Sequence, residues 1–109
     1  MTISDVLSRA ADAIQERGHC KGNFVDAAGN LCVAGALYLA AGLPVVGIAK
    51  PRDGWDAAKS YADADEAAAA FRRYVGSSVY TWNDQPERTK EEVVAALRAA
   101  AEQHRQQGD

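Results

Sequence analysis

The chain has 109 residues and a formal net charge of −3 at pH 7, with a pI near 5.3. This acidic balance argues against nucleic acid and anionic lipid as partners, because both require an excess of Lys and Arg. Hydrophobic residues make up 48% of the chain, but 23 of them are alanines and only 20 are Leu, Ile, Val or Phe. We therefore expect residues 1–109 to form a single, mostly α-helical domain of four helices around a thin core.

The first helix is predicted over residues 4–17. Thr2 or Ser4 can cap its start, and Gly18 can take the left-handed turn that ends it. Apolar residues recur at helical spacing and form one stripe along it: Ile3, Leu7, Ala10 and Ile14.

A short β-hairpin or tight loop is expected near residues 24–33, where two short apolar pieces flank a Gly-Asn turn. Residues 33–41 are apolar or small on every side, which predicts a buried second helix that ends at Gly42. Gly35 would let another backbone approach this helix closely. Residues 27–49 carry no charge, but glycines and a proline interrupt them, so we interpret this stretch as buried protein and not as a membrane span.

The third helix is predicted from Asp63 to the residue before Gly76, and a helical turn over residues 55–61 can extend it. Residues 43–54 are expected to form an irregular loop or a partial strand. Residues 77–84 are expected to form a connecting strand or loop.

The last helix is predicted to begin at Thr89, because Thr89 and Glu92 have the spacing of a capping box. The residues after His104 are polar and are expected to fray. The inner stripe of this helix has helical spacing: Val93, Ala96, Leu97 and Ala100.

Three segments carry a resemblance: RGHCKG at residues 17–22, GNLCVAGAL at 29–37 and WNDQPERTKEEV at 82–93. Together they resemble a family of small uncharacterised proteins, a domain of unknown function, from actinobacteria and their phages. The resemblance covers nearly the whole chain and implies a cytoplasmic setting, but it implies no activity. In such proteins the position of His19 is more usually aromatic, and that of Cys20 is not reliably a cysteine.

Cys32 is the candidate nucleophile. It is predicted to lie just before a helix, where the positive end of the helix dipole lowers the pKa of a thiol. His19 would then serve as its base, with Asn83 or Asp84 orienting the imidazole. The alternative interpretation is that Cys32 is a packed thiol between two apolar neighbours.

Four residues offer soft ligands for a metal ion: His19, Cys20, Cys32 and His104. Adjacent side chains such as His19 and Cys20 usually diverge, and the sequence has no Cys-x-x-Cys pair. We therefore predict no metal and no cofactor.

The segment around Trp82 is the candidate ligand-binding loop. In one interpretation Trp82 stacks on a ligand while three polar side chains recognise it: Asn83, Asp84 and Arg88. In the other, Trp82 covers the thin core, an Asx turn precedes Pro86, and Arg88 pairs with Asp84.

The leading functional hypothesis is a non-catalytic cytoplasmic binding module that self-associates and binds a protein or a small metabolite. Exposed aromatic residues could form its interface: Trp55, Tyr61, Tyr74 and Tyr80. One alternative is a small cysteine-dependent hydrolase or transferase that uses Cys32. Another is a phage antagonist that binds a host protein or a signalling nucleotide.

Overall fold

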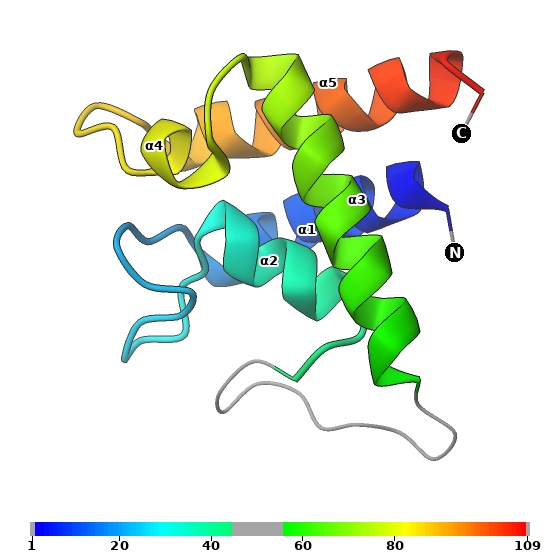
Figure 1. Cartoon of the computed structure of the whole chain (residues 1–109). Coiled ribbons are helices and arrows are strands. Elements are labelled where there is room, and N and C mark those ends of the chain that lie inside the picture. The colour runs from blue at the N-terminus through cyan, green and yellow to red at the C-terminus, as the bar shows by residue number, and fades with distance from the viewer. Residues whose placement is uncertain (1, 45–55, 109) are drawn as a thin grey trace.

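The computed structural model describes residues 2–44 and 56–108, and the chain forms five helices within them (Figure 1). Their bounds are α1 (Ile3–Arg17), α2 (Val33–Ala40), α3 (Ala57–Val75), α4 (Val79–Asn83) and α5 (Lys90–Gln106). The predicted helical class is confirmed, but the helix count differs. The strand or loop expected over residues 77–84 is instead the short helix α4, whose Ser78 cap accepts a hydrogen bond from the Thr81 N–H.

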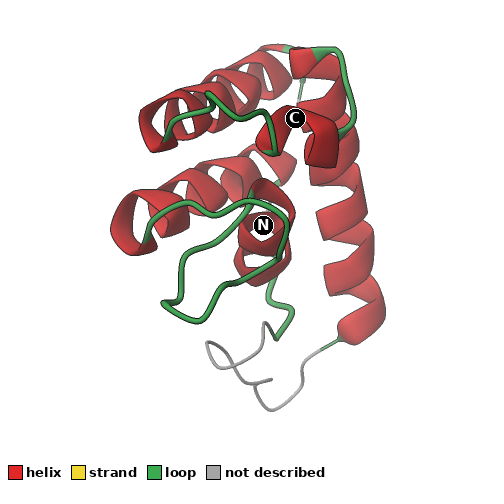
Figure 2. Ribbon diagram, turned by 90° about the vertical axis from the view of Figure 1, so that its left-hand side faces the viewer, coloured by secondary structure: helices red, strands yellow, loops and turns green. Residues whose placement is uncertain are grey.

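The long helices α1 and α5 lie side by side and antiparallel, so both chain ends lie on the same side of the molecule (Figure 1). Helix α3 stands along one side of the other helices (Figure 2). It packs on α1, α2 and α5, while α2 packs between α1 and α3. The largest fully buried side chains come from four helices and from the loop before α2: Leu7, Ile14, Leu31, Leu37, Phe71 and Leu97. Fully buried alanines on α1 and α3 let the helices approach closely, which offsets the shortage of bulky side chains.

Local signals at the helix ends explain most of the boundaries. Thr2 caps α1 in a capping box with Asp5, and Gly18 ends the helix at φ 109° and ψ 170°. That ψ lies outside the left-handed helical conformation expected for Gly18. The predicted end of α3 before Gly76 is confirmed, and Gly76 takes the left-handed conformation at φ 80° and ψ 13°.

Helix α3 begins earlier than predicted. Asp56 is its cap, because its carboxylate accepts a hydrogen bond from the Lys59 N–H. Asp63 does not start the helix and instead pairs with Lys59 one turn away. The helical turn expected over residues 55–61 is thus part of α3 from Ala57 onward. Most of the loop expected over residues 43–54 lies outside the described residues.

The final helix, α5, begins directly after the predicted cap, Thr89. Thr89 and Glu92 form both hydrogen bonds of the predicted capping box, which is thereby confirmed. The helix continues to Gln106, beyond His104, where fraying was expected. In residues 2–44 and 56–108, no helix is both long enough and apolar enough to cross a membrane.

In place of the hairpin expected near residues 24–33, the structure has two isolated β-bridges in this part of the chain. Val25 pairs with Leu31 in one antiparallel bridge, and His19 pairs with Leu31 in one parallel bridge. The Leu31 N–H donates to the Gly18 carbonyl, so the loop folds back on the end of α1 instead of extending into two strands. The Asp26 carboxylate closes the turn by accepting hydrogen bonds from Asn30 and a neighbouring backbone N–H.

The close approach predicted at Gly35 is confirmed. The loop backbone passes directly over α2 there, and a Cβ on Gly35 would overlap the carbonyl oxygen of Phe24. Such a Cβ would also lie 2.9 Å from the Phe24 carbonyl carbon. Glycine at this position therefore sets how tightly residues 18–32 pack on α2.

Candidate functional site

Asn83 is the centre of a buried hydrogen-bond network at the end of α4. Its side chain is 1% exposed. The amide Nδ2 donates to the Cys20 carbonyl at 3.1 Å and to the Asp84 carboxylate at 2.8 Å. The amide Oδ1 accepts from the Val33 N–H at 3.0 Å and lies 2.7 Å from His19 Nε2. One side chain thus joins α4 to the loop of residues 18–32 and to the start of α2.

Trp82 is held between an aromatic ring and a cation. Its ring contacts the buried Phe71 ring edge to face, with 5.2 Å between the ring centroids, and the Arg88 guanidinium carbon lies 3.9 Å from the Trp82 ring centroid. Arg88 Nε also donates to the Trp82 carbonyl at 3.0 Å. Arg88 pairs with Glu92, not with Asp84 as the sequence suggested, because α5 places Glu92 one helical turn away.

The four predicted ligand-binding residues are neighbours, but their side chains serve different contacts. Asp84 accepts from the Gly22 N–H at 3.1 Å and so fixes the loop that follows α1. Asn83 is fully engaged, and Trp82 faces Phe71 and Arg88. Trp82 packs on the core, as the architectural interpretation expects, whereas the pairing of Arg88 with Asp84 in that interpretation is not formed.

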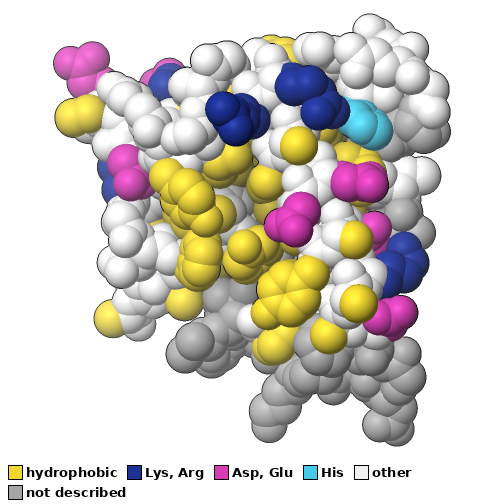
Figure 3. All heavy atoms as spheres, viewed as in Figure 1, with side chains coloured by type: hydrophobic (Ala, Val, Ile, Leu, Met, Phe, Trp, Pro, Cys, Tyr) yellow, Lys and Arg dark blue, Asp and Glu magenta, His cyan; other side chains and the backbone are white. Residues whose placement is uncertain are grey.

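Four aromatic side chains form a connected row across α2, α3, α4 and the loop before α2: Phe24, Tyr38, Tyr61 and Tyr80. We call this row the aromatic surface. The centroid distances between neighbouring rings are 6.3 Å for Tyr61 to Tyr38, 5.2 Å for Tyr38 to Phe24 and 6.3 Å for Phe24 to Tyr80. Three of the rings remain exposed: 53% of Tyr61, 42% of Phe24 and 55% of Tyr80. Figure 3 shows hydrophobic side chains gathered on this face.

A groove of about 340 Å³ lies beside the aromatic surface, between α2, α3 and α4. Leu37, Val79 and small alanines form its apolar lining, while Tyr38 and Tyr80 border it. Burial raises the pKa of the Tyr38 hydroxyl, and nearby acidic groups raise it further, so this hydroxyl is neutral at physiological pH. The groove thus has a mostly apolar lining to which Asp65, Arg72 and Ser78 add polar groups.

The expectation of exposed aromatic residues is partly met. Tyr61, Tyr74 and Tyr80 are exposed, as expected. Trp55 lies outside the described residues. The sequence does not identify Phe24 and Tyr38 as members of this surface, because Phe24 falls in the expected hairpin and Tyr38 in the expected buried helix. No local pattern signals that these two rings meet, since their contact depends on how the loop crosses α2 at Gly35.

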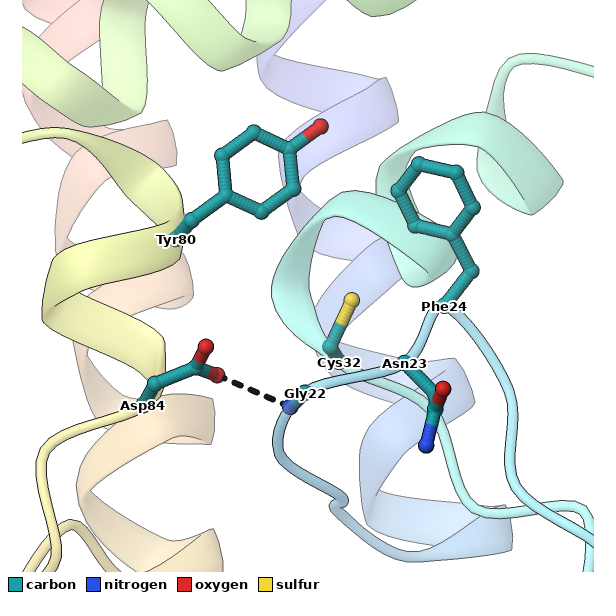
Figure 4. Close-up of a pocket in the computed structure, with 6 residues that line it drawn as sticks. All are labelled: Gly22, Asn23, Phe24, Cys32, Tyr80 and Asp84. Carbon is teal, nitrogen blue, oxygen red and sulfur yellow. Dashed lines mark hydrogen bonds between the residues drawn. The ribbon is translucent and has the colours of Figure 1, made fainter.

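A second hollow of about 330 Å³ adjoins the aromatic surface and contains the Cys32 thiol; we call it the thiol pocket. Its lining residues are Gly22, Asn23, Phe24, Cys32, Tyr80 and Asp84. The sulfur of Cys32 points toward the space between the Tyr80 and Phe24 rings (Figure 4). Phe24 and Tyr80 are shared with the aromatic surface, so the two features form one continuous face.

Cys32 caps α2, as its position before the helix predicted, because its sulfur accepts a hydrogen bond from the Gly35 N–H at 3.3 Å. Burial nevertheless raises its pKa, and this effect outweighs the backbone N–H groups, which lower it. The thiol is therefore protonated at neutral pH. In Cys20, burial raises the pKa to about 11.

His19 is committed to Asn83. Both partners of the Asn83 Nδ2 can only accept hydrogen bonds, which fixes the orientation of the amide. Asn83 Oδ1 is then an acceptor, so His19 Nε2 carries the proton and donates it. In the part of the chain that the structure describes, no hydrogen bond joins His19 to Cys32. The geometry does not form the predicted nucleophile and base pair.

The candidate metal ligands make other contacts. The Cys20 sulfur donates to the carbonyls of Asn23 and Asn30, both at 3.3 Å. His104 lies near the end of α5. Among residues 2–44 and 56–108, no group of three or more His, Cys, Asp or Glu side chains is placed to hold a metal ion.

Comparison with known proteins identifies a family but no characterised relative. A family of unknown function, DUF6197, matches residues 1–103 of the chain. No curated protein and no solved structure matched the chain. Because the matched region covers almost the whole sequence, the chain belongs to the DUF6197 family.

Proposed function

We propose that this chain is a non-catalytic module that binds a protein partner through the aromatic surface. The observation that carries the proposal is the unbroken row of ring contacts from Tyr61 to Tyr80, on which three rings stay exposed. Contiguous exposed apolar patches are uncommon on proteins that act alone, and Tyr and Phe are enriched where proteins meet. Tyrosine suits this role because its ring can be buried while its hydroxyl stays hydrated or bonded.

The contacts of the polar side chains support a binding role over catalysis. The Cys32 thiol is protonated, and His19 donates its Nε2 proton to Asn83. A cysteine-dependent hydrolase requires a thiolate or a base beside the thiol, and this arrangement provides neither. We also propose that the module acts in the cytoplasm of an actinobacterium and is encoded by the bacterium or by its phage. The two buried cysteines, which are both free, fit the cytoplasmic part of this proposal.

The test compares variants on and off the aromatic surface. Tyr80→Ser and Tyr61→Ser each remove a ring of the surface, while Tyr74→Ser removes a ring that is 40% exposed but takes no part in these contacts. Each tagged protein captures partners from lysate of its source cells, and mass spectrometry quantifies what is retained. Circular dichroism of every variant confirms that the fold is intact.

We expect at least one protein that the wild type and Tyr74→Ser retain equally. Tyr80→Ser should reduce its retention by about tenfold, a typical effect of removing an aromatic side chain at the centre of an interface. Equal retention by all three variants would contradict the proposal, because the partner would then bind elsewhere.

The thiol pocket favours a small metabolite as a second candidate ligand. Its volume of about 330 Å³ lies at the lower end of the range for small-molecule sites, and aromatic, thiol and carboxylate groups line it. Native mass spectrometry of the untagged protein, incubated with lysate of its source, would detect such a ligand as extra mass that is lost on denaturation. Extra mass of protein size would instead support the partner proposed above, and a bare subunit would argue against a tightly held metabolite.

A further inference from the structure

One stripe of α3 extends the aromatic surface and carries two opposite charges. Its members recur at helical spacing: Tyr61, Asp65, Ala68 and Arg72. Asp65 and Arg72 both line the groove. They are seven residues apart, about 10 Å along the helix axis, whereas charges on one helix meet at a spacing of three or four residues. Within residues 2–44 and 56–108, neither side chain takes part in an ion pair.

We propose that the partner on this face is a second copy of the chain, an inference that rests on the binding function proposed above. The two α3 helices would cross antiparallel around a two-fold axis between Ala68 and Ala69. Positions 65 and 72 are equally distant from that centre, so Asp65 of each copy faces Arg72 of the other. A two-fold axis forms this ion pair twice, because the same patch is used on both copies. The charges that cannot meet within one chain are thus complementary between two.

The side chains around the proposed axis suit a close crossing. Ala68 is half-buried and Ala69 is exposed, and neither would hold the two helices apart. Tyr61 and Tyr80 flank this centre on α3 and α4, so each copy would cover exposed rings of the other. The groove, which Leu37, Val79 and Tyr80 help to line, would also lose its contact with water.

Charge reversal tests this arrangement with exposed residues whose replacement leaves the core untouched. Asp65→Arg gives each copy two positive charges at the contact, and Arg72→Asp gives each copy two negative charges. Each variant alone should therefore repel its own copy, whereas an equimolar mixture of the two restores both ion pairs. Sedimentation velocity over a range of concentrations measures the dimer fraction of each protein and of the mixture, and circular dichroism confirms that both variants fold.

We expect a wild-type dimer, a dissociation constant at least about tenfold weaker for each variant, and recovery of the dimer in the mixture. A wild type that stays monomeric at millimolar concentration would overturn the inference. Variants that dimerise as well as the wild type, or a mixture that stays monomeric, would overturn it too. A monomeric wild type that still captures another protein through Tyr80 would refute this dimer and leave the proposed binding function standing.

Discussion

Replacing Asn83 with alanine removes the network that fixes the end of α4. When the amide is lost, the side chains of His19 and Asp84 can form hydrogen bonds with water instead, because neither residue is fully buried. The Val33 N–H and the Cys20 carbonyl cannot, since their hydrogen bonds to Asn83 are buried. A buried polar group left without a partner costs about 1–3 kcal/mol, so two such groups cost about 2–6 kcal/mol. This loss is a large share of the roughly 5–15 kcal/mol that stabilises a domain of this size.

Urea unfolding followed by circular dichroism measures this effect. Asn83→Ala should lower the free energy of unfolding by about 2–6 kcal/mol, while the slope of that free energy against urea concentration stays unchanged. Asn23→Ala is the matched control, because it truncates an exposed asparagine of the neighbouring loop and should change stability by less than about 0.5 kcal/mol. If Asn83→Ala and the control have the same stability, the network does not hold the corner together and the reasoning is refuted.

Three further predictions follow from other contacts. Gly35→Ala should destabilise the fold by about 1–3 kcal/mol in the same urea assay, because its Cβ would collide with the Phe24 carbonyl. Cys32 should react with iodoacetamide more slowly than free glutathione at neutral pH and faster as the pH rises, measured by peptide mass spectrometry; rapid reaction would support catalysis. A hydrogen bond from Asn30 lowers the pKa of Asp26, so this carboxylate stabilises the fold above about pH 4, and that stabilisation is lost as the pH falls further. Stability measured against pH should therefore fall less steeply in acid for Asp26→Ala than for the wild type.

Features set by neighbouring residues could be predicted from the sequence. The capping box of Thr89 and Glu92 and the end of α3 at Gly76 depend on neighbouring residues, and the structure confirms both. The sequence also predicts the close backbone approach at Gly35, because a glycine inside an apolar helix usually has a packing reason, and the structure confirms it. The start of α3 was misplaced because two acidic residues, Asp56 and Asp63, can each act as a cap, and local sequence does not rank them.

Features set by distant residues could not be predicted. The partners of Asn83 lie 50 and 63 residues away for Val33 and Cys20, so no local pattern reveals that its amide would be buried and fully bonded. The aromatic surface depends in the same way on how separate elements pack. Phe24 and Tyr38 meet only because the loop crosses α2, and this crossing joins the two rings to those of α3 and α4.

Site-specific photo-crosslinking tests most directly whether the aromatic surface is where the protein meets a partner. p-Benzoylphenylalanine is placed at position 61, 80 or 74, one position at a time, and cells of the source organism that express each protein are irradiated. Adducts should form from positions 61 and 80 and not from position 74, whether the captured protein is a second copy or another chain. Adducts that form equally from position 74, or that are missing from both surface positions, would contradict the account.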